Sequence, residues 1–126
     1  DGLPIVGRSA RMLGVRVPPA TPSDVTPDTG GNLRPGTGGM SVAPKAMSHL
    51  PAYRRPRGMG PGSTGKAGDR VYGVRGAALA QQALEVRLDA EHPTLHGLVE
   101  PTAVMPLPRY EAAIAATRQA WRQEWP

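Results

Sequence analysis

Apolar and charged residues alternate over 84–88, and this period of two is typical of a half-buried β-strand. A second apolar run at 95–100 follows after a short connection, so we expect the two strands to pair. Residues 77–83, rich in Ala, Leu and Gln, predict a short helix. Short runs of apolar and β-branched residues predict three further strands, at 11–17, 40–43 and 71–74.

The end of the chain predicts a helix that begins near Pro108. Proline suits the first helical turn, and Glu111 suits the positive end of the helix dipole. Large side chains recur there at spacings of three and four residues and would share one face: Tyr110, Ile114, Thr117, Trp121 and Trp125. We interpret this stripe as core rather than as a cofactor-binding surface.

These elements predict one domain over residues 1–126 with an α+β fold, built from a small split sheet of mixed or antiparallel strands and few helices. The chain has 16 glycines and 15 prolines, most of them before residue 70. We therefore expect 1–70 to be loop-rich and 71–126 to hold the strands and the C-terminal helix. The long loop predicted at 44–70 is typical of a lid or a binding loop.

Two near-copies of a glycine-rich turn occur at 27–31 and 35–39. Each contains two adjacent glycines, which can take positive φ and let backbone N–H groups face an anion without a Cβ in the way. Only the second copy leads directly into a strand-like run. We therefore expect 35–42 to approach a ligand.

Composition narrows the classes of partner and of chemistry. The formal net charge of +5 favours an anionic partner such as nucleic acid, a phosphate-bearing cofactor or an acidic protein. The densest basic run is 53–57, which also fits an ordinary solvated loop. Without cysteine, a disulfide framework or a thiolate site is excluded. No apolar stretch is long enough to span a bilayer, and because the chain starts at Asp1 rather than Met we expect a fragment or processed product.

Several motifs resemble chemical sites but lack a necessary part. Residues 60–67 match a phosphate-binding P-loop up to Lys66, but Ala67 replaces the hydroxyl residue that binds metal. His92 and His96 have the spacing of two zinc ligands on a helix, which the intervening Pro93 makes improbable, so no metal is expected. Glu100 ends a predicted strand, a position where catalytic carboxylates are often presented.

Three stretches together resemble a family of interbacterial type VI secretion effector toxins with an ADP-ribosyltransferase-like fold. They are the string Thr37-Gly38-Gly39-Met40-Ser41-Val42, the strand from His96 to Pro101, and Tyr110 followed by a helix with Arg118 and Trp121. The resemblance covers residues 28–125. It implies a toxin secreted or injected by a bacterium, active in the target-cell cytoplasm, and neutralised by a tight-binding immunity protein, which the basic charge predicts to be acidic.

The resemblance also implies that NAD is the substrate, with either ADP-ribosylation of a macromolecule or simple NAD hydrolysis as the reaction. Carried over residue by residue, it assigns Thr37 and Ser41, with the adjoining Gly38 and Gly39, to NAD binding, and His96 to the catalytic strand. Glu100 is our inference from position, as a carboxylate that stabilises positive charge on the ribose. Either Arg11 or Arg16 would serve as the family's early arginine. Met40 stands where the family often has a hydroxyl residue.

Two alternatives to NAD chemistry remain open from the residues. The first is a non-catalytic nucleic-acid-binding module that uses the basic side chains Arg54, Arg55, Arg57, Lys66 and Arg70. The second is a toxin of the same fold that attacks RNA. The acceptor of ADP-ribose, nucleic acid or protein, is also open.

Overall fold

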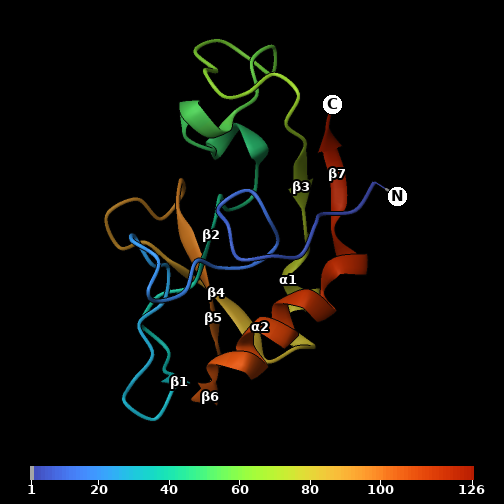
Figure 1. The fold of residues 1–126 in the computed structure, drawn as a ribbon. Helices are drawn as coiled ribbons and strands as arrows, with labels where there is room; N and C mark the ends of the chain where they lie inside the picture. Colours follow the sequence, from blue (N-terminus) through green and yellow to red (C-terminus); the bar gives the residue numbers. More distant parts are fainter. Residues whose placement is uncertain (1) are drawn as a thin grey trace.

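The computed structural model describes residues 2–126 as an α+β fold with few helices and small antiparallel sheets (Figure 1). Strands β2 (Met40–Val42), β5 (Gly97–Pro101) and β4 (Leu84–Leu88) form a three-stranded sheet in that order. Two further sheets have two strands each: β1 (Asn32–Leu33) with β6 (Met105–Pro106), and β3 (Val71–Gly73) with β7 (Arg122–Trp125). The helices are α1 (Gly76–Ala80) and α2 (Leu107–Ala116). The predicted class and the strands at 40–43, 71–74, 84–88 and 95–100 are confirmed within a residue or two.

The register of the three-stranded sheet decides which side chains share a face. Val99 of β5 stands opposite Met40 of β2 and Val86 of β4, and Leu98 stands opposite Ser41 and Arg87. Because successive side chains of a strand point to opposite faces, the first set lies on one face and the second, with Ser41 and Leu98, on the outer face. Val99 and Met40 are buried, whereas Val86 of the edge strand β4 is 37% exposed. The predicted pairing of β4 with β5 is confirmed, but in β4 only Leu84 is buried.

Helix α2 packs on the core, as the large residues at helical spacing predict. Tyr110, Ile114 and Trp121 are all buried, and Ile114 is 1% exposed. The predicted helix is nevertheless too long. α2 ends at Ala116, a 3-10 turn, η3 (Arg118–Ala120), follows, and the last residues form β7 instead. Trp125 pairs with Val71 in that sheet, so the backbone at the end of the chain bonds to β3 rather than within a longer helix.

The predicted strand at 11–17 is wrong, although its burial pattern is right. Leu13, Val15 and Val17 are buried at alternating positions, but only Leu13 forms a bridge, with Val6. The backbone of Arg16 is bonded to a side chain, because its N–H donates to the Asp24 carboxylate at 2.7 Å. The segment is extended but has no strand paired beside it. Alternating apolar residues predict which side chains are buried, but they do not show that another strand pairs with the segment.

Residues 44–70 form a lobe at the end of the molecule near the C-terminus (Figure 1), as the predicted long loop requires. Its regular structure consists of two 3-10 turns, η1 (Met47–His49) and η2 (Ala52–Arg54). We call 44–70 the basic lobe. Among residues 2–126, no helix is both long and apolar enough to cross a membrane.

Candidate functional site

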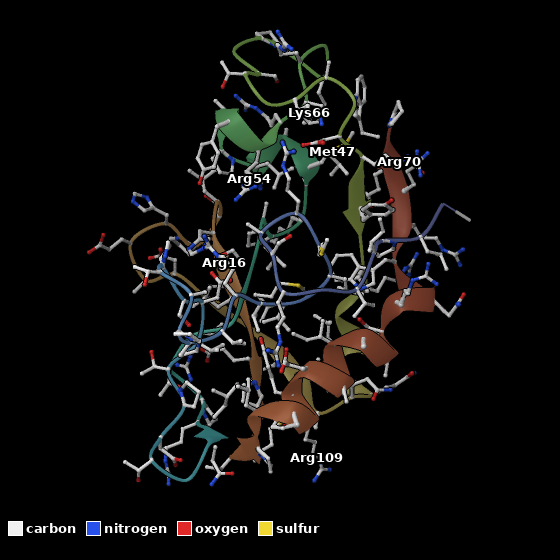
Figure 2. The ribbon with its side chains drawn as sticks, in the orientation of Figure 1. Arg16, Met47, Arg54, Lys66, Arg70 and Arg109 are labelled. Carbon is white, nitrogen blue, oxygen red and sulfur yellow. The ribbon has the colours of Figure 1, made fainter. Side chains whose placement is uncertain are left out.

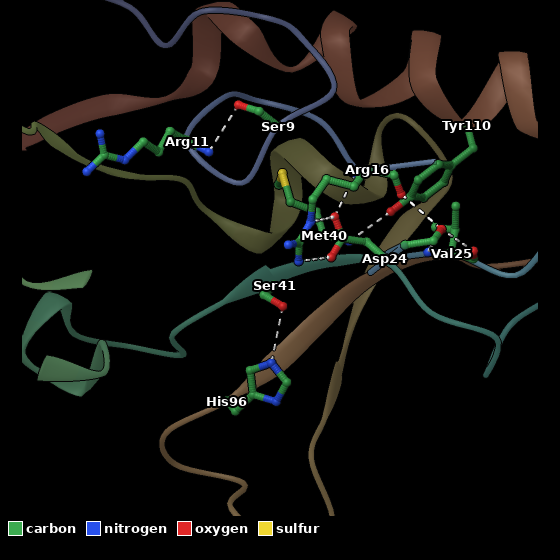
Figure 3. Close-up of polar contacts among 10 residues, drawn as sticks. Ser9, Arg11, Arg16, Asp24, Val25, Met40, Ser41, His96 and Tyr110 are labelled. Atoms are coloured by element: carbon green, nitrogen blue, oxygen red, sulfur yellow. Dashed lines mark hydrogen bonds and ion pairs between the residues drawn. The ribbon is translucent and has the colours of Figure 1, made fainter. Parts of the chain in front are cut away.

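A serine, a histidine and an aspartate form a hydrogen-bonded row on the outer face of the three-stranded sheet. His96 Nε2 lies 3.3 Å from Ser41 Oγ, and His96 Nδ1 lies 3.2 Å from the Asp89 carboxylate. Figure 3 shows the Ser41 hydroxyl directed at the imidazole, away from the Arg16 and Asp24 side of β2. Ser41 and His96 belong to separate stretches of the sequence, and the structure brings them together.

The sheet register explains why these three residues meet. Ser41 stands opposite Leu98, so its side chain shares the outer face with residues two positions along β5 in either direction. His96 lies just before β5 and Asp89 just after β4, and the Asp89 N–H donates to the His96 carbonyl at 3.0 Å. The hairpin connection therefore places the imidazole between the hydroxyl and the carboxylate.

The Asp89 carboxylate is held in place by the turn that joins the two strands. It accepts the backbone N–H of Glu91 at 2.8 Å and that of His92 at 3.3 Å. The Glu91 N–H and then the His96 hydrogen bond lower the pKa of Asp89 below the ordinary value for aspartate. Asp89 was missed by the sequence analysis. Its position at the end of one predicted strand, opposite His96 at the start of the next, could have indicated that it contacts His96.

Glu100 lies on the same outer face but is enclosed by the chain. Its side chain is 1% exposed, and its carboxylate accepts Arg87 Nε at 2.6 Å and the Gly36 N–H at 2.9 Å. The Arg87 side chain is 53% exposed and closes over the carboxylate. Glu100 thus anchors the loop before β2 to β5, and the structure does not bring it into contact with Ser41 or His96.

The glycines of the Thr-Gly-Gly string approach the protein's own backbone. Gly38 has a φ of +115°, and a Cβ there would collide with the Asp24 carbonyl. A Cβ on Gly39 would collide with the Val99 carbonyl, and the Gly39 N–H donates to Asp24 at 2.9 Å. Thr37 donates its hydroxyl to the Arg34 carbonyl at 2.7 Å. The absence of side chains at Gly38 and Gly39 therefore lets the backbone just before β2 pack directly against the backbone at Asp24 and Val99.

Arg16 and Arg11 each have a carboxylate partner. Arg16 donates to both oxygens of Asp24, at 2.7 and 3.1 Å, and Arg11 lies 2.8 Å from Asp69. Partial burial raises the pKa of Asp24, but the Arg16 side chain and backbone hydrogen bonds outweigh it, so the net pKa is lowered. The ionised Asp24 carboxylate accepts both hydrogen bonds from Arg16 and so fixes the position of the guanidinium beside β2.

A cavity of about 1110 Å³ borders four of the residues assigned from sequence, namely Arg11, Arg16, Ser41 and His96. Arg11 and Arg16 come from an N-terminal segment, Ser41 from β2, and His96 from just before β5. The Ser41 hydroxyl points to His96 and away from the Arg16 side of β2. The other four assigned residues do not border it: Thr37, Gly38, Gly39 and Glu100. In the described part of the chain, no three His, Asp or Glu residues are grouped so that they could hold a metal ion.

The cavity is also bordered by three cations of the basic lobe, Lys45, Arg54 and Arg70. Arg54 and Arg70 are labelled in Figure 2. Within residues 2–126, none of the three has a carboxylate at ion-pair distance. The site is therefore a large, cationic cavity with a hydrogen-bonded serine and histidine at its border. No family model, curated protein or solved structure matches the chain.

Proposed function

We propose that the cavity binds NAD and that the domain breaks the bond between nicotinamide and ribose, as an ADP-ribosyltransferase or an NAD glycohydrolase. The observation that carries the proposal is that Arg11, Arg16, Ser41 and His96 border one cavity although they are far apart in sequence. Of these residues, the resemblance to ADP-ribosyltransferase-like toxins assigns Ser41 and His96 by motif, and either Arg11 or Arg16 would serve as the early arginine. The proposal also includes that this α+β fold is ADP-ribosyltransferase-like.

Size and charge support a dinucleotide as the ligand. Pockets for drug-sized ligands are roughly 300–1,000 Å³, and this cavity, at about 1110 Å³, is larger. NAD carries two phosphates, and Lys45, Arg54 and Arg70 offer positive charge with no described carboxylate at ion-pair distance. Arginine and lysine are the side chains that best bind phosphate oxygens.

The chemistry requires a leaving group, an acceptor and a site for one proton. Nicotinamide leaves with the electrons of the broken bond, and positive charge develops on the ribose. Water or a macromolecular nucleophile then bonds to the ribose carbon and releases a proton. His96 Nε2 is an acceptor suited to that proton, and the Ser41 hydroxyl beside it can hydrogen-bond the substrate. Glu100 would stabilise the ribose only if the Gly36 loop and Arg87 moved away.

The resemblance extends the proposal to a biological setting. We propose an antibacterial toxin domain that is secreted or injected by a bacterium and acts in the cytoplasm of the target cell. An acidic immunity protein would neutralise it, since the net charge of +5 favours an acidic partner. The acceptor of ADP-ribose would be protein or nucleic acid.

Replacing Ser41 by Ala, or His96 by Ala, should lower NAD consumption by at least ~10-fold, because each change removes one member of the hydrogen-bonded pair at the cavity. The measurement incubates purified domain with NAD and cell extract, following both nicotinamide release and the transfer of labelled ADP-ribose to macromolecules. The two readouts separate hydrolysis from transfer.

An exposed residue outside the cavity serves as the matched control, Ser48→Ala. This variant should consume NAD at the rate of the unmodified domain. If the unmodified domain consumes no NAD with or without extract, the proposal fails. Glu100→Gln adds a further comparison, since full activity of that variant would assign Glu100 to folding alone.

A second candidate, nucleic-acid binding, is favoured by where the charge lies. The basic lobe has one carboxylate, Asp69, and six cationic residues, so its excess of five equals the formal net charge of +5 of the whole chain. Tyr53 in the lobe is 66% exposed and stacks with Arg54 at 5.3 Å, which offers an aromatic surface to a base. The six cations are Lys45, Arg54, Arg55, Arg57, Lys66 and Arg70.

If this lobe binds RNA, the logarithm of the affinity should fall linearly with the logarithm of the salt concentration, at about −0.7 per phosphate contact for a single strand. Arg57→Ala with Lys66→Ala should reduce the slope by roughly one to two. Arg109→Ala with Arg122→Ala, exposed cations outside the lobe, should not change it. Fluorescence anisotropy with a single-stranded RNA measures the slope, and binding independent of salt would reject this function.

A further inference from the structure

The row formed by Ser41, His96 and Asp89 has the connectivity of a hydrolase triad. The hydroxyl meets one imidazole nitrogen at 3.3 Å, and the other nitrogen meets the carboxylate at 3.2 Å. We propose that Ser41 Oγ is a nucleophile that attacks small activated carboxylic esters, with His96 as its base and Asp89 as the positioning residue. This activity does not depend on NAD, and it is independent of the function proposed above.

The carboxylate decides which imidazole nitrogen carries the proton. An ionised Asp89 can only accept hydrogen bonds, so His96 Nδ1 must donate, which leaves Nε2 as the acceptor for the Ser41 hydroxyl. The backbone N–H groups of Glu91 and His92 hold the carboxylate in its ionised form and in one orientation. The same logic of nucleophile, base and orienting acid defines Ser-His-Asp sites on unrelated folds.

An ester can reach this row from solvent. Ser41 is exposed, the His96 side chain is 41% exposed, and both border the large cavity. Lys45 borders the same cavity, and no described carboxylate lies at ion-pair distance from it. Distances slightly longer than an ideal hydrogen bond are usual before a substrate binds.

The proposed reaction balances without a cofactor. Ser41 Oγ bonds to the ester carbonyl carbon while its proton passes to His96 Nε2, and the alcohol leaves with that proton. Water then attacks the acyl-serine, gives a proton through His96 to Ser41 Oγ, and releases the carboxylic acid. The net reaction is hydrolysis of one ester to one acid and one alcohol.

The test uses a fluorophosphonate probe, which labels activated serines covalently, and p-nitrophenyl acetate, both in the absence of NAD. We expect a single label on Ser41 by peptide mass mapping, and none in Ser41→Ala. His96→Ala and Asp89→Asn should each slow labelling and p-nitrophenol release by at least ~10-fold. Asp89→Glu should retain more of the rate than Asp89→Asn, because it preserves a charged, acceptor-only carboxylate, whereas the amide of asparagine can also donate to the imidazole.

The controls separate chemistry from folding. Thermal melts of all variants should agree within a few degrees, since the three side chains are at least partly exposed. Ser48→Ala, at an exposed serine outside the cavity, should label at the unmodified rate. Labelling spread over several serines, or labelling of Ser41 that is indifferent to His96→Ala, would overturn the proposal. Because no NAD is present, loss of NAD consumption in the earlier assay and loss of labelling here are independent results.

Discussion

Gly39→Ala is expected to destabilise the fold by at least ~3 kcal/mol, which lowers the melting temperature by roughly 10 °C. The new Cβ would collide with the Val99 carbonyl and press on the Tyr110 hydroxyl. Backbone of the central strand cannot move aside as a flexible side chain can, so β2 would separate from β5. Differential scanning calorimetry or a circular dichroism melt measures the change.

Gly76→Ala is the matched control for this substitution. Gly76 begins α1, its φ is not positive, and nothing lies within 4 Å of the position where its Cβ would stand. This variant should be neutral or slightly stabilising, because alanine is the better helix former. If Gly39→Ala melted like Gly76→Ala but lost NAD consumption, the glycine would serve the ligand, as the sequence analysis expected, and not the packing.

Tyr110→Phe is expected to cost about 2–4 kcal/mol, although it removes one oxygen atom. The Tyr110 side chain is fully buried, and its hydroxyl donates to the Val99 carbonyl at 2.6 Å and accepts the Met40 N–H at 3.1 Å. Phenylalanine would leave two buried backbone groups without that partner. Burial raises the pKa of Tyr110 above its ordinary value, so the hydroxyl stays protonated as a donor. Urea unfolding measures the loss.

Tyr53→Phe provides the control. The Tyr53 side chain is 66% exposed, so the loss of its hydroxyl leaves no buried polar group without a hydrogen-bond partner. That variant should change the free energy of unfolding by less than about 0.5 kcal/mol. Equal stability of the two variants would show that the hydroxyl of Tyr110 does not join α2 to the strands. The interaction matters to the site because β2 carries Ser41 and β5 follows His96.

Local pattern was sufficient for most of the secondary structure after residue 70. The alternation over β4 and the helical spacing over α2 are both properties of neighbouring residues, and both were predicted. Pairs such as β1 with β6 were missed, because Asn32 and Pro106 carry no strand signal of their own. They become strands only through the partner that the fold places beside them.

The candidate site divides in the same way. Ser41 and His96 were assigned from short strings that resemble those of a toxin family. Their mutual hydrogen bond, the addition of Asp89, and the burial of Glu100 under Arg87 depend on the register of three strands. A shift of one residue would send each side chain to the other face, so no local window contains this information.

The amino-acid sequence by itself determined that this protein is a basic, cysteine-free α+β chain with a loop-rich first half and a glycine turn that enters a strand. Composition and near-neighbour periodicity are sufficient for those features. Only the tertiary structure decided that the glycines pack against backbone, that Glu100 is enclosed, and that Ser41 meets His96 at a cationic cavity. Each of those outcomes joins residues that are distant along the chain, and long-range packing sets their geometry.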